Sequence, residues 1–226
     1  MKSPFFVAKA FAFLFVAQAF PSHWVIEAES PATRVLLRND TLDITSPAGL
    51  SLWWDEPLQG NVIISYRACV VVDGGPTDRL SDLNCFWMAT DPAAEPAQSP
   101  LRGAAKRGGR FVESYRLRCY YVGFGGNYNT TTRFRRYDAD TTAVADAARR
   151  PQILTEYTDS AHLLQPNRWY DIRLECIDGR VRYYVDDTLF VDFIDPESLK
   201  RGWFSLRTTW SHLRLTAFRL SNNYSR

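Results

Sequence analysis

Short alternating segments separated by turn residues are the feature that most restricts the fold of this chain. The clearest one is RWYDIRLECIDGRVRYYVDD, where every second residue from Tyr170 to Cys176 is apolar and the residues between them are charged. A period of two indicates a β-strand with one face on a core. The Asp-Gly dipeptide after it is a strong signal for a two-residue hairpin. This stretch therefore predicts two adjacent antiparallel strands.

The same pattern recurs along most of the chain. The expected strands span residues 24–28, 33–38, 41–46, 50–55, 61–73, 84–90, 115–123, 130–137, 153–158, 169–177, 180–186, 188–194, 203–209 and 212–221. Only Thr141–Arg149 is typical of a helix, and Asp91–Gly109 is expected to be a long surface loop, either mobile or in contact with a ligand. These strands predict an all-β protein, a β-sandwich jelly roll of two antiparallel sheets with little helix. The C-terminal blocks RWYDIRLECIDGRVRYYVDDTLFVDFID and GWFSLRTTWSHLRLTAFRL resemble the closing strands of concanavalin-like jelly rolls.

The N-terminal residues are typical of an export signal. Lys2 provides a positive start, and Ala10–Phe20 is an apolar run of the length of a signal-peptide core. The small residues Ala17 and Ala19 would allow cleavage, so we expect a signal peptide at 1–19 and a single mature domain at 20–226. The alternatives are a buried strand or a short anchor, although a membrane helix needs about 20 apolar residues. We expect a secreted or periplasmic protein without stable membrane insertion.

Charge and cysteine content narrow the class further. The chain has 27 basic and 25 acidic residues, a formal charge of +2, which argues against a nucleic-acid binder. Its four cysteines, Cys69, Cys85, Cys119 and Cys176, lie in expected strands without C-x-x-C spacing, so a zinc site is not expected. Export permits disulfides, but we expect four buried thiols. We also expect a monomer.

The segment YYVGFGGNYNTTTRFRRYD, residues 120–138, carries the chemistry that most suggests a function. In a strand, Arg133, Arg135 and Tyr137 share one face, while Phe134 and Arg136 take the other. Guanidinium forks bind carboxylate, sulfate or phosphate, and tyrosine rings stack or form hydrogen bonds. This face therefore predicts a site for an anionic, ring-shaped ligand. The alternative is a solvated basic strand.

A uronate, the acidic sugar of many glycans, would be such an anionic, ring-shaped ligand. A lyase that cleaves a uronate-containing glycan must neutralise the uronate carboxylate, remove the C5 proton and protonate the leaving oxygen. The candidate catalytic residues are Tyr120, Arg135, Tyr137 and His212. The candidate substrate-binding residues are Arg67, Asn84, Arg118, Asn127, Asn129, Arg133, Glu156 and Arg207. For Glu156, an ion pair with the arginine cluster is the alternative role, and for His212 a structural one.

Two resemblances extend this interpretation. The blocks LWWDEPLQGNVIISYRACVVVDGGPTDRLSDLNCFWMATDP, YYVGFGGNYNTTTRFRRYD, PQILTEYTD and LLQPNRWYDIRLECIDGRVRYYVDD resemble an exported bacterial concanavalin-like jelly-roll family of largely unassigned activity, associated with polysaccharide utilisation. The second block is also similar to a strand motif of jelly-roll alginate lyases, with Val122 in place of the motif's lysine. The resemblance implies a carbohydrate-active protein.

The leading hypothesis is an exported protein that acts on an acidic polysaccharide or oligosaccharide by β-elimination on a concave sheet face. The alternatives are a non-catalytic, lectin-like carbohydrate-binding domain, and a hydrolase or lyase of modified keto-sugars. No cofactor and no catalytic metal is expected. Structural calcium could use carboxylates near Asp73 or between Asp138 and Asp140.

Overall fold

The computed structural model describes residues 23–95 and 97–222 of the chain. In chain order its elements are β1 (Trp24–Ala28), β2 (Arg34–Arg38), β3 (Thr41–Trp54), β4 (Leu58–Gln59), β5 (Val62–Val70), β6 (Leu83–Thr90), α1 (Pro100–Arg107), η1 (Phe111–Arg116), β7 (Arg118–Gly125), α2 (Gly126–Asn129), β8 (Thr131–Asp138), η2 (Thr141–Val144), η3 (Ala147–Arg149), β9 (Thr155–Tyr157), η4 (Ser160–His162), β10 (Trp169–Ile177), β11 (Arg180–Val185), β12 (Thr188–Ile194) and β13 (Arg201–Asn222). The signal peptide expected at 1–19 lies outside the described residues.

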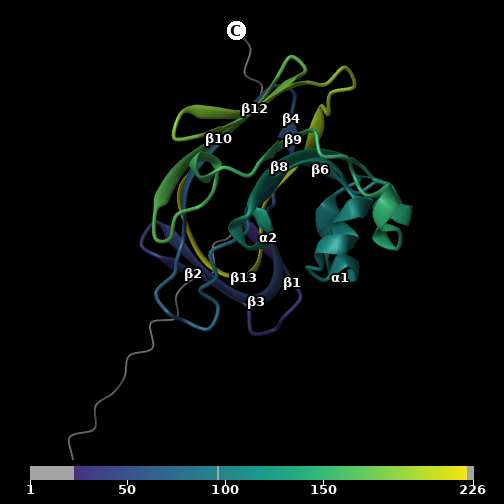
Figure 1. Ribbon diagram of the computed structural model, residues 1–226. Coiled ribbons are helices and arrows are strands. Elements are labelled where there is room, and N and C mark those ends of the chain that lie inside the picture. The colour runs from purple at the N-terminus through teal and green to yellow at the C-terminus, as the bar shows by residue number, and fades with distance from the viewer. Residues whose placement is uncertain (1–22, 96, 223–226) are drawn as a thin grey trace, which may run out of the picture.

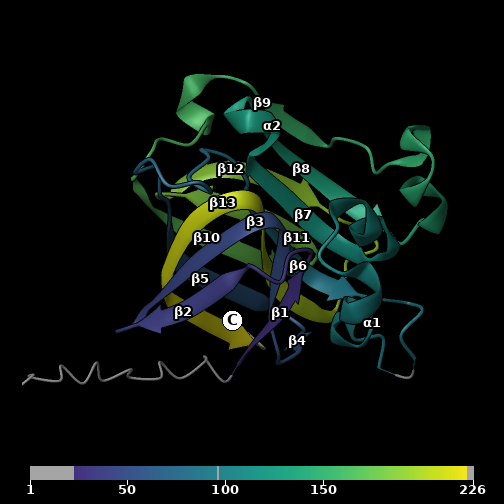
Figure 2. The same ribbon diagram turned by 90° about the horizontal axis from the view of Figure 1, so that it is seen from below.

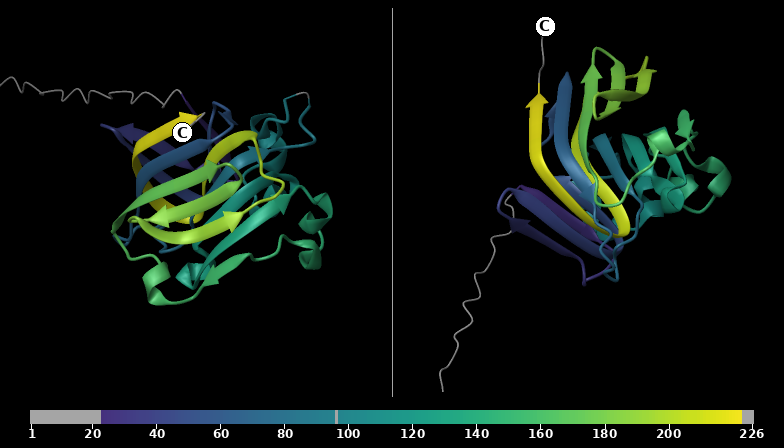
Figure 3. Two further views of the ribbon diagram at one scale, coloured as in Figure 1. Left: turned by 90° about the horizontal axis from the view of Figure 1, so that it is seen from above. Right: turned by 60° about the vertical axis from the view of Figure 1, so that its left-hand side comes forward.

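Two long strands, β3 and β13, take part in both layers of the sandwich. They pair antiparallel, with a bulge between Thr209 and Ser211. Before the bulge β13 pairs with β6, and after it with β5, so one curved strand passes from sheet to sheet (Figure 3). The sequence predicts two separate strands in each of these places. The structure has one bent strand in each, because a bulge bends a strand without ending it.

Two antiparallel sheets result. The front sheet contains β1, the second half of β3, the first half of β13, and then β6, β7, β8 and β9. The back sheet contains β2, the other halves of β3 and β13, and then β5, β10, β11 and β12 (Figure 2). The predicted hairpin between β10 and β11 is present. The predicted jelly roll of two antiparallel sheets is confirmed.

The main core fills the space between the sheets. Alternation along each strand supplies it with the buried residues Leu52, Leu206, Cys85, Val122 and Phe134 from the front sheet and Ile64, Leu174, Tyr183, Val191 and Leu215 from the back sheet. The four cysteines are buried free thiols, as predicted. Burial raises the pKa of Cys85 and Cys176 to about 12, so these thiols remain protonated and unreactive at neutral pH.

A helical insert covers half of the front sheet's outer face, the face turned away from the main core. It consists of α1 and η1, joined by η2 from a later loop (Figure 1). Beneath it lies a second apolar cluster formed by Trp53, Phe86, Ala89, Tyr115, Leu117, Cys119, Tyr121, Tyr137, Ala143 and Trp203. Among the described residues, no helix has the length and apolar character needed to span a bilayer.

This insert corrects three predictions. The loop expected at Asp91–Gly109 contains α1, and the strand expected from Tyr115 begins only at Arg118, after η1. The helix expected at Thr141–Arg149 is two short 3₁₀ turns. These segments lack a strong period of their own, so their structure follows from the apolar patch that they cover.

The side chain of Arg107 attaches the insert to the sheet. It is 1 % exposed, and it donates to Glu27 Oε2 at 2.6 Å and to Asp91 Oδ2 at 2.9 Å. Its guanidinium also lies 5.6 Å from the Trp53 ring centre. Each charge of this buried group therefore has an opposite charge beside it, the condition under which a buried ion pair is tolerated.

Candidate functional site

A row of mostly polar side chains crosses the uncovered half of the front sheet's outer face. Strand pairing places these residues side by side, from β9 to β3: Glu156, Arg133, Gly123, Asn84, Arg207 and Ser51. Neighbouring strands are about 4.8 Å apart, so residues from six strands become one continuous surface. The next row, two residues further along each strand, contains Tyr121, Phe86 and Trp53 and leads under the insert.

A cavity of about 470 Å³ lies over this row. Its floor is the sheet, and its sides are η1, the β7–β8 turn and the loop before β6: Phe111, Val112 and Tyr115; Gly126, Asn127 and Tyr128; Arg79 and Asp82. Gly123 shapes the floor, because a Cβ there would lie 2.8 Å from the Tyr121 hydroxyl. The glycine thus allows the Tyr121 phenol to lie across the sheet toward the cavity.

Positive charge dominates the cavity. Five arginines line it: Arg79, Arg133, Arg135, Arg150 and Arg207. Asp82 pairs with the first and Glu156 with the second. In the described part of the chain the other three form no ion pair; Arg135 donates to the carbonyl of Pro151, and Arg150 stacks 5.7 Å from the ring centre of Tyr115. Five guanidinium groups thus face two carboxylates, which favours an anionic ligand.

Arg207 is the most telling of these side chains. It is 3 % exposed and donates to Ser51 Oγ at 3.3 Å and to the carbonyl of Gly109. Burial lowers its pKa, and the surrounding acids and Tyr121 only partly oppose this effect. Keeping a guanidinium buried without a carboxylate is costly. Such a group is expected where a ligand supplies the missing negative charge.

Asn84 adds a second unsatisfied group to the floor. It is 3 % exposed, and its Nδ2 donates to Asp82 Oδ1 at 3.1 Å. Its Oδ1 is buried and accepts no hydrogen bond from the described residues. Buried polar atoms almost always have a partner, so this oxygen is an unsatisfied acceptor in the floor of the cavity.

The tyrosines of the cavity are neutral groups. Burial raises the pKa of Tyr121, and nearby Asp82 raises it further. Burial also raises the pKa of Tyr115, although Arg150 and Arg135 oppose the shift. Both phenols therefore stay protonated near neutral pH and can donate hydrogen bonds, but they are poorly suited to remove a proton.

Half of the residues predicted from sequence meet at this cavity. Those that line it are Asn84, Asn127, Arg133, Arg135 and Arg207. Glu156 is close by as the ion partner of Arg133, which is its alternative predicted role.

Two predicted catalytic tyrosines lie elsewhere. Tyr120 is on the inner face of β7, where its hydroxyl donates to Asp195 Oδ2 at 2.7 Å. Tyr137 shares the face of Arg133 and Arg135, as predicted, but the insert buries it completely and its hydroxyl has no partner. Burial raises the pKa of both. Neither reaches the cavity, because strand alternation turns the first inward and the insert covers the second.

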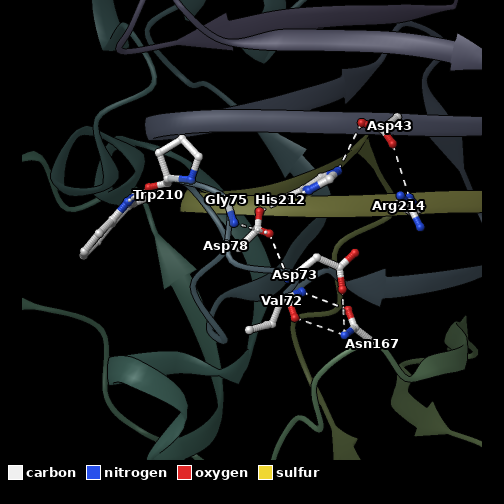
Figure 4. A network of polar contacts seen from close by, with 10 residues as sticks. Asp43, Val72, Asp73, Gly75, Asp78, Asn167, Trp210, His212 and Arg214 are labelled. Atoms are coloured by element: carbon white, nitrogen blue, oxygen red, sulfur yellow. Dashed lines mark hydrogen bonds and ion pairs between the residues drawn. The ribbon is translucent and has the colours of Figure 1, made fainter.

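His212 belongs to a separate polar network beside the loop that precedes β6 (Figure 4). Its Nε2 lies 3.1 Å from Asp43 Oδ1 and its Nδ1 lies 3.2 Å from Asp78 Oδ1. Arg214 pairs with the other oxygen of Asp43, and Asp78 Oδ2 accepts backbone N–H groups of its own loop. His212 therefore fastens a loop to the sheet and is not brought together with the other predicted catalytic residues.

Three predicted binding residues also have other surroundings. Arg67 pairs with Asp171 on the back sheet. Arg118 lines a different hollow, at the far end of β7. Asn129 ties the β7–β8 turn to Leu164 through two hydrogen bonds, of 2.8 and 2.9 Å.

Sequence reasoning missed further polar residues of the cavity, among them Arg79, Asp82, Tyr115, Tyr121, Tyr128 and Arg150. Of these, Tyr121 could have been identified from the sequence, because it shares strand parity with Gly123 and the hairpin pairs it with Arg135. The others come from loops and 3₁₀ turns, whose position in space no periodicity encodes.

One group of possible metal ligands occurs in the described residues: His23, Asp55 and Glu56. These side chains are largely exposed, and none lines the cavity. Of the turns expected to offer calcium ligands, the Asp140 carboxylate caps the Thr142 backbone N–H, and the Asp73 carboxylate accepts from Asn167.

Comparison with known families identifies the chain. Residues 44–218 match the family described as a domain of unknown function (DUF6250), and the protein belongs to this family. No curated protein sequence matches the chain.

Solved structures show the same fold. A Bacillus subtilis protein of unknown function with a galectin-like fold has a TM-score of 0.64 at 14% identity, covering 90% of both chains. The carbohydrate-binding module CBM66 from Bacillus subtilis gives 0.57 at 12% identity, covering 88% of this chain and 96% of that one. The exoplasmic/lumenal domain of VIP36, bound to Ca²⁺ and Man3GlcNAc, gives 0.58 at 10% identity, covering 90% and 85%. At these identities the likeness concerns the fold.

Proposed function

We propose that this protein is a carbohydrate-binding domain, and that the cavity on the front sheet's outer face binds an acidic sugar residue of a glycan. The observation that carries the proposal is Arg207, which is buried in the cavity and forms no ion pair with the described residues. The half-buried Arg135 and the exposed Arg150 line the same cavity and also form no ion pair there. Domains of the same fold that include a carbohydrate-binding module and a glycan-bound lumenal domain support a carbohydrate ligand, and the acidic character is proposed from the arginines.

The cavity offers complementary groups to both parts of such a ligand. A uronate carboxylate or a sulfate would bind the guanidinium forks, each of which can donate two parallel hydrogen bonds. A ring hydroxyl would donate to Asn84 Oδ1, and the Tyr121 hydroxyl would lie beside the ring. Few precisely placed polar groups in a largely preformed hollow are typical of small-ligand sites.

Binding is better supported than cleavage. Elimination at a uronate needs a group that accepts the C5 proton near neutral pH. Tyr120, Tyr137 and His212 lie outside the cavity, and the raised pKa of Tyr121 keeps its phenol protonated. Among the described residues of the cavity, the carboxylate Asp82 is held by Arg79. The arrangement thus favours the lectin-like alternative over β-elimination, and no observation favours keto-sugar chemistry.

The test is affinity electrophoresis of the protein in gels containing alginate, polygalacturonate, glucuronoxylan or chondroitin sulfate. For each uronate polymer, a carboxyl-reduced preparation serves as the matched neutral control; chondroitin sulfate is desulfated as well, because its sulfate esters would otherwise remain charged. We expect retardation by at least one acidic polymer, loss of retardation with its reduced form, and weakening by salt. Equal retardation by acidic and reduced polymers, or none at all, would refute the proposal. Ultraviolet absorbance of the same mixtures would reveal an unsaturated product and reinstate the lyase.

A further inference from the structure

Next to the cavity, Arg79 lies between two exposed aromatic rings. Its guanidinium carbon is 4.9 Å from the centre of the Tyr128 ring and 5.5 Å from the centre of the Trp210 ring. Tyr128 is 70% exposed and Trp210 is 46% exposed, and they are the large aromatic side chains most open to solvent in the described residues. Exposed aromatic surface that is gathered in one place marks a binding surface.

Hydrogen bonds hold two members of this stack, Arg79 and Trp210, in place. Tyr128 and Trp210 have left-handed backbone conformations, with φ of 59° and 42°, which bulky residues rarely adopt. The Trp210 Nε1 donates to the carbonyl of Pro76 at 3.0 Å, and Arg79 Nε donates to the carbonyl of Trp210 at 3.1 Å. A platform that is ordered before the ligand arrives loses little conformational entropy on binding.

The charge of the stack is already compensated. Arg79 forms its ion pair with Asp82, unlike Arg135, Arg150 and Arg207. The stack therefore offers ring faces more than charge. The face of an aromatic ring carries partial negative charge, and the apolar C–H face of a pyranose, with its slightly positive hydrogens, is complementary to it.

We propose that Tyr128, Arg79 and Trp210 form a second sugar subsite, in which the residue next to the acidic sugar in the cavity lies with its C–H face on an aromatic ring. The inference rests on the proposed function, because the two subsites are continuous. Arg79 and Tyr128 line the cavity, and Thr209, the neighbour of Trp210, lines it too. The subsite selects for an oligosaccharide over the single acidic sugar, whichever charge the second residue carries.

The test compares Trp210→Ala with the wild-type protein by isothermal titration, because Trp210 does not line the cavity. The probes are the acidic monosaccharide and the tetrasaccharide of whichever polymer retards the protein most. We expect the tetrasaccharide to bind about three- to tenfold more weakly to the variant and the monosaccharide to bind equally. Trp210→Phe, which retains a ring, should restore most of the tetrasaccharide affinity. Thermal unfolding of each variant checks that the fold is intact.

The outcomes separate this inference from the proposed function. If the wild type binds neither probe, the proposed function fails and the subsite with it. If the wild type binds the tetrasaccharide and Trp210→Ala binds it equally well, only the subsite is refuted. An equal loss for both probes also refutes it, because the ring would then act through the cavity. Quenching of tryptophan fluorescence by the tetrasaccharide, absent in Trp210→Phe, would be the direct signature of stacking.

Discussion

Two buried arginines at the outer face of the front sheet differ in whether an acidic side chain lies beside them, and this difference separates a structural role from a functional one. Arg107 fastens the insert at the covered half of the front sheet, and Arg207 lies in the cavity at the open half; they are 1 % and 3 % exposed. Arg107 pairs with Glu27 and Asp91, whereas Arg207 donates only to a hydroxyl and a carbonyl. The buried cation of the covered half has carboxylate partners within the protein, and among the described residues the buried cation of the open half has none.

This difference between the two arginines indicates where a ligand binds. Burial alone does not mark a site, because Arg107 is the more deeply buried of the two. Absence of an internal counter-charge does, because the free energy that it costs is recovered only when a ligand binds. The His212 network follows the pattern of Arg107, since Asp43 and Asp78 face both ring nitrogens and Arg214 completes the chain.

The largest effect on stability is expected from removing the charge of Arg107. Arg107→Met would leave Glu27 and Asp91 buried without their partner, so we expect a loss of about 3–5 kcal/mol in the free energy of unfolding. Urea denaturation measures it. Arg118→Met, at an exposed position, is the matched control and should change stability by less than about 0.5 kcal/mol. Equal urea midpoints for both variants would contradict the role of Arg107 in attaching the insert to the sheet.

The corresponding change at Arg207 should act on binding. Arg207→Met removes a buried cation that has no acidic partner, so the free energy of unfolding should change by no more than about 1 kcal/mol. Affinity for the acidic glycan should fall by about 2–5 kcal/mol, as measured by isothermal titration. Arg207→Lys keeps the charge without the fork and should lose less. If Arg207→Met instead unfolds like the Arg107 variant and binds normally, the two halves do not differ as we infer.

A change of pH should alter the stability that the His212 network provides. Burial raises the pKa of Asp78, but the N–H groups of Asp73 and Gly75 and the ring of His212 outweigh it, so its pKa lies below the ordinary value. The stabilisation is therefore complete above the unfolded pKa of about 3.9 and disappears as pH falls through the lower folded pKa. Asp78→Asn should lose about 1–3 kcal/mol at pH 7 and progressively less in acid.

Urea titrations at several pH values check this dependence. Asp171→Asn serves as the control. It breaks the exposed ion pair between Asp171 and Arg67, whose side chains are 67% and 50% exposed respectively, so it should have little effect at any pH. A constant difference between wild type and Asp78→Asn down to pH 2 would show that the carboxylate charge does not stabilise the loop.

The smallest effect is expected at the cavity mouth. Arg150 is exposed and lacks an acidic partner, so Arg150→Gln should weaken glycan binding by less than about 1 kcal/mol. The difference should vanish in about 1 M salt, where charges are screened within about 3 Å. Arg102→Gln, an exposed arginine of α1 outside the cavity, should bind like the wild type at every salt concentration. A loss at Arg150 that persists in high salt would indicate a buried contact.

Part of the cavity could be predicted from the sequence. The period of two predicts Arg133 and Arg135 on one face of the strand and Phe134 on the other. The pairing of β8 with β7 extends the same two faces to β7. The same reasoning chose Tyr120 in place of Tyr121. Parity tells which residues share a face, but not which face lies against the second sheet, and in β7 that is the face of Tyr120.

The class of fold and most strand positions follow from the sequence alone, because alternation and turn residues are local signals that each strand carries. The sequence also shows that β8 carries three arginines and Tyr137. Which of these side chains meet in one site depends on the tertiary structure. The cavity joins residues 79 to 209 through strand pairing and loop packing, and some arginines find their acidic partner only through contacts between distant residues, as between Arg107 and Glu27.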